Sequence, residues 1–241
     1  MRPFRPVSVA HTALVTALVT APVTALVTSI GLASAVRLHA QQPARAFTVD
    51  RDRSHIFVVV HRAGLLSFLG HEHAVVPTAW SAQLCLGDPI DRGSHGSLTL
   101  ETGSLLIDTD PARTLAGLGA GPSAADRATL QEKLLDSTRL DARGHAEITL
   151  AVDSVSTTRG RGLVGFARLT LRGITRAVTV PIRRAGTDAR PEFSGVLTVR
   201  QTDYGITPES KAGVVKVADP VDLHFLLVAV ATDRRCGPRP G

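Results

Sequence analysis

The sequence predicts an all-β protein of about eight antiparallel strands with one short inserted helix. After residue 46, apolar residues alternate with polar ones almost throughout, which is the periodicity of half-buried strands. Gly, Asp and Pro residues separate these runs and favour turns between them. Eight such strands close into a barrel or pack as a sandwich, and a closed barrel exposes no edge and has room for one small ligand.

The first forty residues have the pattern of a secretory signal peptide. Arg2 and Arg5 precede an uncharged stretch over residues 13–32, and small residues follow, so we expect cleavage after Ala35 or Ala40. A proline interrupts the stretch, which favours its removal over the alternative, a retained anchor of about 20 residues. We therefore expect no stable membrane span and a periplasmic or secreted protein.

Composition excludes a nucleic-acid-binding role. Residues 1–40 hold three arginines and no acidic residue, so their removal lowers the formal net charge from +6 to +3. A nucleic-acid binder normally has a clustered basic face or stacking aromatic residues, and this chain has one Trp and one Tyr. The remaining chain fits a single domain over residues 41–232, followed by a flexible polar tail over residues 233–241.

Eight strand-like regions follow one another along the mature chain. They cover residues 47–64, 79–86, 97–108, 146–158, 162–173, 177–186, 192–205 and 222–233. The clearest pair of neighbouring strands is connected by a turn at residues 172–175. Leu169 and Leu171 alternate with polar residues before this turn, and Val178 and Val180 do so after it. This pattern predicts an antiparallel hairpin with one apolar face.

Residues 122–140 break the alternation and predict a short amphipathic helix. Ser123 and Asp126 have capping-box-like spacing, and Leu130 and Leu134 recur at helical spacing. In an antiparallel barrel, such a helix is either a lid or plug, or an element that merely closes the bottom.

Cys85 and Cys236 are the only cysteines in the chain. An exported protein meets an oxidising compartment in which they could pair. However, Cys236 lies in the predicted tail, and the sequence does not place the two Cα atoms within bridging distance. The sequence therefore favours two unpaired cysteines over a disulfide.

Two histidines flank a glutamate at His71, Glu72 and His73. A zinc metalloprotease motif needs its second histidine four residues after the first, where Val75 stands, so this chain lacks the motif. In a strand, His71 and His73 would share a face and could offer two ligands to a metal. Candidates for a third ligand are His55, His61 and His224. The pattern favours the alternative, in which these imidazoles bond to the backbone or line a polar barrel mouth.

Other catalytic or cofactor-binding motifs are missing from the sequence. The glycines of residues 117–121 lack the spacing and the βαβ setting of a dinucleotide loop. No nucleophile elbow or Walker loop occurs, and the acidic residues form no evident acid/base couple. The sequence therefore predicts a binding protein without a cofactor, not an enzyme.

Several stretches of the chain resemble the YceI-like family. They are residues 165–178 (GFARLTLRGITRAV), 195–206 (GVLTVRQTDYGI) and 215–221 (VKVADPV), with residues 47–50, Ser54, Ile56 and Gly70 at the family's spacing. The likeness covers Phe47 to about Thr232. The family consists of exported bacterial proteins whose lipocalin-like barrel holds an isoprenoid lipid. The resemblance therefore implies such a barrel and an isoprenoid or quinone-like ligand.

The chain departs from the family pattern at several positions. Arg62 stands where the family often has a histidine, and Glu72 stands where it often has an aromatic residue. Residues 135–140 also alter the stretch before the central strand. The chain therefore looks like a GHxH-bearing branch of the family, for which the resemblance implies the fold more strongly than the identity of the ligand.

An isoprenoid ligand would need an apolar barrel interior, in which each buried CH₂ contributes about 0.8 kcal/mol. Candidate lining residues are Ile56, Val58, Val60, Leu98, Leu100, Leu169, Leu171, Val178, Val180 and Phe225. Candidates to meet a ligand head group near the mouth are Arg62, His71, His73 and Arg200. The alternation does not reveal which face of each strand points inward.

Three functions stay open at this point. The first is a carrier or storage protein for an isoprenoid or quinone-like lipid. The second is a histidine-dependent metal- or haem-binding protein or enzyme on the same barrel, using His71 and His73. The third is a stress or surface protein whose cavity is filled by its own side chains. The sequence does not indicate the oligomeric state.

Overall fold

The computed structural model describes residues 44–64, 71–160, 162–211, 215–237 and 239. The predicted signal peptide and Gly70 lie outside these described residues. Among the described residues, no helix is long and apolar enough to cross a lipid bilayer.

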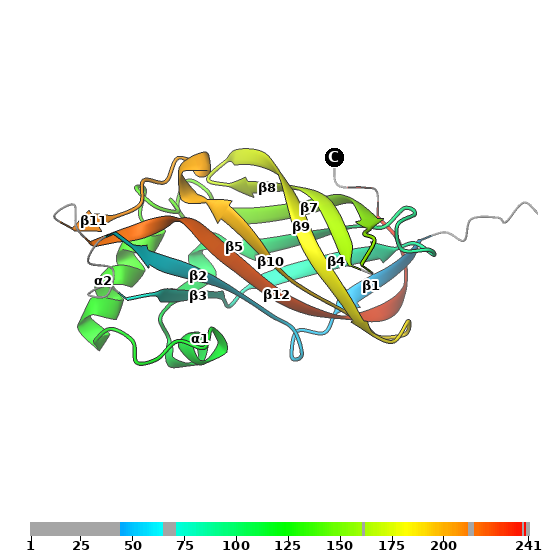
Figure 1. Ribbon diagram of the computed structural model, residues 1–241, viewed down its shortest axis with the longest axis horizontal. Helices are drawn as coiled ribbons and strands as arrows, with labels where there is room; N and C mark the ends of the chain where they lie inside the picture. The colour runs from blue at the N-terminus through cyan, green and yellow to red at the C-terminus, as the bar shows by residue number, and fades with distance from the viewer. Residues whose placement is uncertain (1–43, 65–70, 161, 212–214, 238, 240–241) are drawn as a thin grey trace, which may run out of the picture. The chain divides into compact units, whose positions relative to one another are not determined.

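Eight antiparallel strands close into a barrel, which confirms the predicted fold class and decides against a sandwich (Figure 1). Three of the eight consist of two segments: β1 (Arg45–Val49) with β2 (His55–Ala63), β3 (His73–Pro77) with β4 (Trp80–Leu86), and β5 (His95–Glu101) with β6 (Leu105–Ile107). The others are β7 (Glu147–Thr157), β8 (Leu163–Leu171), β9 (Ile174–Gly186), β10 (Pro191–Arg200) and β12 (Val215–Arg235). The ring closes because β1 and β2 both pair with β12.

Short elements connect or extend these strands. The 3₁₀-helix η2 (Thr102–Ser104) separates β5 from β6, η3 (Gln201–Tyr204) follows β10, and β11 (Ser210–Lys211) pairs with β12. The predicted hairpin is confirmed, since Leu171 pairs with Ile174 between β8 and β9. Arg172 and Gly173 form its turn with φ values of 52° and 71°. Positive φ at both central residues is the type I′ geometry, which matches the twist of the flanking strands.

The part of the chain that the structure describes forms two α-helices where the sequence predicted one. The predicted helix is α2 (Ala124–Leu135), and the Ser123 hydroxyl caps it by accepting the Asp126 N–H. The helix missed by the sequence is α1 (Asp110–Leu115), which the Thr109 hydroxyl caps at the Ala112 N–H. Six residues are too few to show a helical period, which is why the alternation pattern did not reveal α1.

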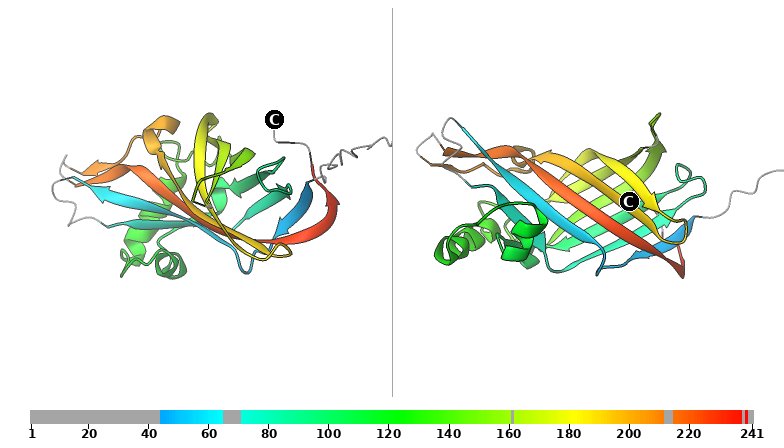
Figure 2. Two further views of the ribbon diagram at one scale, coloured as in Figure 1. Left: turned by 45° about the vertical axis from the view of Figure 1, so that its right-hand side comes forward. Right: turned by 60° about the horizontal axis from the view of Figure 1, so that its bottom comes forward.

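Helix α2 closes one end of the barrel. Its residues Leu130, Leu134 and Leu135 pack against Val75, Leu105 and Ile107 of β3 and β6. The amide of Gln131 accepts the Ile107 N–H at 3.0 Å and donates to the Leu105 carbonyl at 2.8 Å, as a neighbouring strand would. Figure 2 shows both helices at this end of the barrel. The helix is therefore an integral part of the barrel wall as well as a cover for its interior.

The expectation of two unpaired cysteines is wrong, because Cys85 and Cys236 form a disulfide. Strand β12 continues to Arg235, three residues into the segment predicted as a tail, and Arg45 of β1 pairs with Arg235. Since β1 also pairs with β4, this ladder brings the two cysteine Cα atoms to 5.6 Å. The disulfide thus fastens the end of the last strand to β4, across β1.

Candidate functional site: an apolar cavity and a polar barrel end

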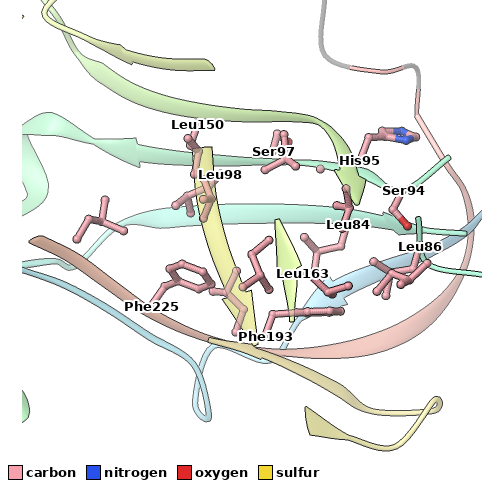
Figure 3. A pocket seen from close by; sticks show the side chains of 18 residues that line it. Leu84, Leu86, Ser94, His95, Ser97, Leu98, Leu150, Leu163, Phe193 and Phe225 are labelled. Carbon is pink, nitrogen blue, oxygen red and sulfur yellow. The ribbon is translucent and has the colours of Figure 1, made fainter. Parts of the chain in front are cut away.

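The barrel interior contains a small apolar cavity at the end away from α2. Its volume is about 90 Å³. Figure 3 shows Leu84 and Leu98 on one side of the cavity and Phe193 and Phe225 on the other, with Leu163 between them. Most of its lining residues are aliphatic or aromatic, and the exceptions are the consecutive residues Ser94, His95, Gly96 and Ser97. The cavity therefore suits a short stretch of hydrocarbon.

The predicted lining residues are distributed over the whole interior. Leu98, Val180 and Phe225 line the cavity itself. Ile56, Val58, Leu100 and Val178 belong to the apolar core beside it, and Val60 packs in the cluster under α2. Leu169 is buried and Leu171 half-buried, outside these clusters.

Several cavity residues were not among the sequence candidates. Leu84, Leu163, Ile182 and Phe193 lie in the predicted strands and follow the same alternation as the chosen ones. The missing information was the inward face of each strand, which the pairing of neighbouring strands decides.

A separate polar groove lies beside α2. It is lined by Arg62, His71 and His73 together with α2 residues and with Lys216 of β12, and its volume is about 510 Å³. Three of the four candidate head-group residues thus meet in one place. Arg200 lies elsewhere, since its guanidinium is 2.8 Å from the Asp219 carboxylate. The groove and the apolar cavity have no lining residue in common.

The metal-site hypothesis required His71 and His73 to lie on the same face of one strand. In the structure they do not. Strand β3 begins at His73, so His71 precedes it and is exposed. His73 Nδ1 is 2.6 Å from the Asp108 carboxylate, which leaves only Nε2 for another partner. Among the described residues, no three His, Cys, Asp or Glu side chains are arranged to hold a metal ion.

A buried ionic network supports the start of β3. The Asp108 side chain is fully buried and accepts hydrogen bonds from His73, the Ala74 N–H and Arg113 Nη1. Arg113 of α1 also donates to the carbonyls of Glu72, Gly119 and Ala120. Burial alone would raise the pKa of Asp108, but these hydrogen bonds, with that from His73 the strongest, lower it below its ordinary range. This network therefore fixes α1, β3 and the loop before α2 to one another.

His61 bridges two carboxylates on the outside of the barrel. Its Nδ1 lies 2.9 Å from Glu72 and its Nε2 lies 2.9 Å from Asp222 of β12. The hydrogen bond with Glu72, and then that with Asp222, raises the pKa of His61 above its ordinary value of 6.5. Sequence reasoning grouped His61 with the possible metal ligands, because the 161-residue separation from Asp222 hides their proximity.

We expect this bridge to weaken as the pH rises. The folded pKa of His61 lies above 6.5, so its stabilising contribution is complete below 6.5 and is lost as the pH rises through the folded value. The His61→Gln variant should therefore lose more stability relative to wild type at about pH 6 than at about pH 9. Denaturant midpoints at both pH values measure this.

An NMR titration of the His61 ring supplies the control for this prediction. Glu72→Gln and Asp222→Asn should each lower its pKa, since each removes one anionic partner. A His61 pKa at or below 6.5 in the wild-type protein would contradict the assignment.

The remaining histidines that the sequence offered as metal ligands have other partners. The His224 ring stacks on Phe57 with centroids 4.6 Å apart and an interplanar angle of 4°. His55, two residues before Phe57 on β2, also stacks on its ring, with centroids 6.4 Å apart and an interplanar angle of 27°. These three rings form an aromatic row on the outer face of β2 and β12.

The closed ring of eight antiparallel strands around an apolar cavity defines the class of lipocalin-like barrels. A family model, the YceI-like domain, matches residues 47–229, which is well over half of the chain. The chain therefore belongs to the YceI-like family, as its sequence motifs indicated.

Solved structures agree with this fold. The crystal structure of BcnA from Burkholderia cenocepacia superposes with a TM-score of 0.57 at 20% sequence identity, covering 76% of this chain and 99% of BcnA. A YCEI protein from Campylobacter jejuni gives a TM-score of 0.50 at 13% identity, covering 66% of this chain and 85% of that protein. A comparison with curated proteins found no match. At these identities the likeness shows the fold alone.

Proposed function

We propose that this protein is an exported carrier or storage protein that binds an isoprenoid or quinone-like lipid inside its barrel. The observation that carries this proposal is the apolar cavity bounded by Leu84, Leu98, Leu163, Phe193 and Phe225. Each CH₂ that moves from water into such surroundings contributes about 0.8 kcal/mol, so a prenyl chain binds with few polar contacts. The YceI-like family membership supports the same ligand class.

The size of the cavity limits how much lipid the barrel holds without rearrangement. Its 90 Å³ is well below the roughly 300–1,000 Å³ of typical ligand pockets. A single prenyl end fits this space, whereas a longer chain must displace side chains of the interior. We infer that lipid uptake expands the barrel by moving residues such as Phe225 and Leu163, which border the cavity.

The disulfide supports export. Disulfides form and persist in oxidising compartments and are rare in the cytosol. The Cys85–Cys236 bond joins strands that are already paired through β1, so the oxidised form fits the folded barrel. Together with the predicted signal peptide, it favours a periplasmic or secreted protein.

Mass spectrometry of an organic extract of the purified protein tests the proposal. We expect about one prenyl lipid for each protein molecule, because this apolar cavity has room for a single chain. Leu98→Trp should reduce the bound lipid, since the larger side chain fills the cavity. The matched control is Leu106→Trp on β6, where the leucine is 38% exposed and the lipid content should stay unchanged.

Circular dichroism of both variants checks that the barrel still forms. Folded wild-type protein that yields no lipid, and binds none when prenyl lipid is added, would overturn the proposal. That result would favour a barrel whose own side chains fill its interior.

A further inference from the structure

A lipid inside this barrel needs a route from the surface to the cavity. At one end, the leucines of α2 pack onto β3 and β6, and Gln131 bonds to the β6 backbone. At the other end, Phe47, Leu163, Phe193 and Ala229 form a buried cluster with Ile90 packed against it. The Cys85–Cys236 disulfide lies at this second end and fastens β12 to β4. The α2 end is therefore closed by packed side chains, whereas at the second end Leu163, Phe193 and Ile90 line the cavity itself.

The wall between β9 and β10 is paired over only part of its length. These strands form a ladder at four positions, from Pro191 with Gly186 to Ser194 with Arg183. Beyond it, residues 174–182 of β9 and 195–200 of β10 have no ladder partner across this boundary, although both are fully described. On their other sides, residues 174–182 of β9 pair with β8, and residues 192–200 of β10 pair with β12. We call this unpaired boundary the β9–β10 seam.

The residues at the start of the seam explain why the ladder stops there. Pro181 has no N–H to donate, and proline in sheets is confined to edges and bulges. Gly195 lies against the Pro181 backbone, and a Cβ at Gly195 would come within 2.1 Å of the Pro181 carbonyl oxygen. The two backbones approach here only because residue 195 has no side chain. At the far end of the seam, Arg176 Nε donates to the Asp203 carbonyl at 3.2 Å.

The inner cavity and an outer groove meet at this seam. The groove runs over the outer face of the barrel and is lined by Pro181, Gly195 and Val196. Leu163, Ile182 and Phe225 line both the groove and the inner cavity, so the two spaces adjoin at these side chains. The groove also includes Phe57 and His224 of the aromatic row, which offer an apolar surface outside the wall.

We propose that the lipid tail enters and leaves the barrel sideways through the β9–β10 seam, by displacement of Ile182 and Phe225, and not past α2. This inference rests on the proposed lipid-binding function. Opening the seam breaks no backbone ladder, whereas opening the α2 end removes the two Gln131 hydrogen bonds and exposes its buried leucines. The outer groove then serves as the surface on which the tail lies before it enters.

Exchange kinetics of a dansyl-labelled farnesyl probe test this route by stopped-flow fluorescence. A Cβ at Gly195 would clash with the Pro181 carbonyl oxygen and with the Phe225 ring, so Gly195→Ala must push β10 away from β9 and shift Phe225. Both association and dissociation should therefore become several-fold faster. The matched control is Gly103→Ala in η2, an exposed glycine with no atom within 4 Å of a new Cβ and no place in the cavity or the groove. Its rates should equal those of wild type.

A crosslink provides a second variant with the opposite expected sign. Thr179→Cys with Thr198→Cys puts one exposed thiol on each edge of the seam, and a short bis-maleimide can join them while the native cysteines remain oxidised. The crosslinked protein should exchange the probe several-fold more slowly than the same protein before crosslinking.

The two proposals fail in distinguishable ways. If the probe binds but its rates change neither with Gly195→Ala nor with the crosslink, the proposed route through the seam is wrong. The proposed lipid-binding function would still stand. Gln131→Ala loosens α2 directly and should leave the exchange rates unchanged. If Gln131→Ala speeds exchange while the seam variants do not, the α2 end is the entrance. Wild-type protein that binds no probe overturns both proposals.

Discussion

Replacing Asp108 by alanine is expected to destabilise the protein by about 3–5 kcal/mol, because it leaves the buried Arg113 guanidinium without its anionic partner. The Asp108 side chain is fully buried and holds His73, Ala74 and Arg113 together. Its φ of 52° adds to the cost, since alanine adopts the left-handed region less readily than aspartate. Chemical denaturation of the folded protein measures the loss.

Two further variants separate the charge from the shape of Asp108. Asp108→Asn keeps the tolerance for positive φ and can still accept the Ala74 N–H, so it should lose less stability than Asp108→Ala. Asp110→Ala removes a carboxylate that is 92% exposed and should change the stability by less than about 0.5 kcal/mol. Equal midpoints for Asp108→Ala and Asp110→Ala would show that the network does not stabilise the fold.

The same network predicts acid sensitivity. Because the folded pKa of Asp108 lies below its ordinary value of 3.8, its contribution is present above that value and is lost as the pH falls through the folded pKa. The stability difference between wild type and Asp108→Asn should therefore shrink below pH 3.8. A difference that stays constant on acidification would contradict the lowered pKa.

Removal of the disulfide is expected to have the second large effect, about 2–4 kcal/mol of lost stability. Cys85 and Cys236 are 151 residues apart, so the bond removes much of the conformational freedom of the unfolded chain. The double variant Cys85→Ser with Cys236→Ser should unfold at a clearly lower denaturant concentration, and the C-terminal part of β12 should detach from β1 first.

Reductant provides the internal control for this prediction. Wild-type protein in a strong reductant should unfold at the same denaturant concentration as the double serine variant, whose own midpoint should not respond to reductant. Hydrogen exchange should show faster exchange near residues 229–235, where β12 pairs with β1. An identical midpoint for oxidised wild type and the double variant would show that the barrel does not depend on this bond.

The local pattern predicted most of the strands and α2, because these elements carry their signal within a few neighbouring residues. Leu169, Leu171 and the residues after the 172–175 turn form the hairpin that their alternation indicated. Strand β3 was not among the predicted strands, since it has only five residues and follows the polar His71 and Glu72. Helix α1 was also missed, because its six residues are too few to show a helical period.

The polar contacts were largely beyond sequence reasoning. Arg62, His71 and His73 were expected together and line one groove. In contrast, the pairing of Asp108 with Arg113 was not predicted, and His73, the other partner of Asp108, lies 35 residues before it in the chain. The position of His61 between Glu72 and Asp222 was not predicted either. The pairing of β2 with β12 brings His61 and Asp222 together from opposite ends of the chain.

The strand periodicity, the capped α2 helix and the turn at residues 172–175 could be predicted from the sequence, because each depends on residue order within a short span. The family could be recognised as well, from motifs spread over residues 47–229. Four features emerged from the three-dimensional fold instead: the closure of the sheet, the pairing of Cys85 with Cys236, the cavity volume of about 90 Å³, and the end of the β9–β10 ladder at Ser194. These features depend on the register between strands distant in the chain. Register sets which side chains face inward and which backbone groups find partners.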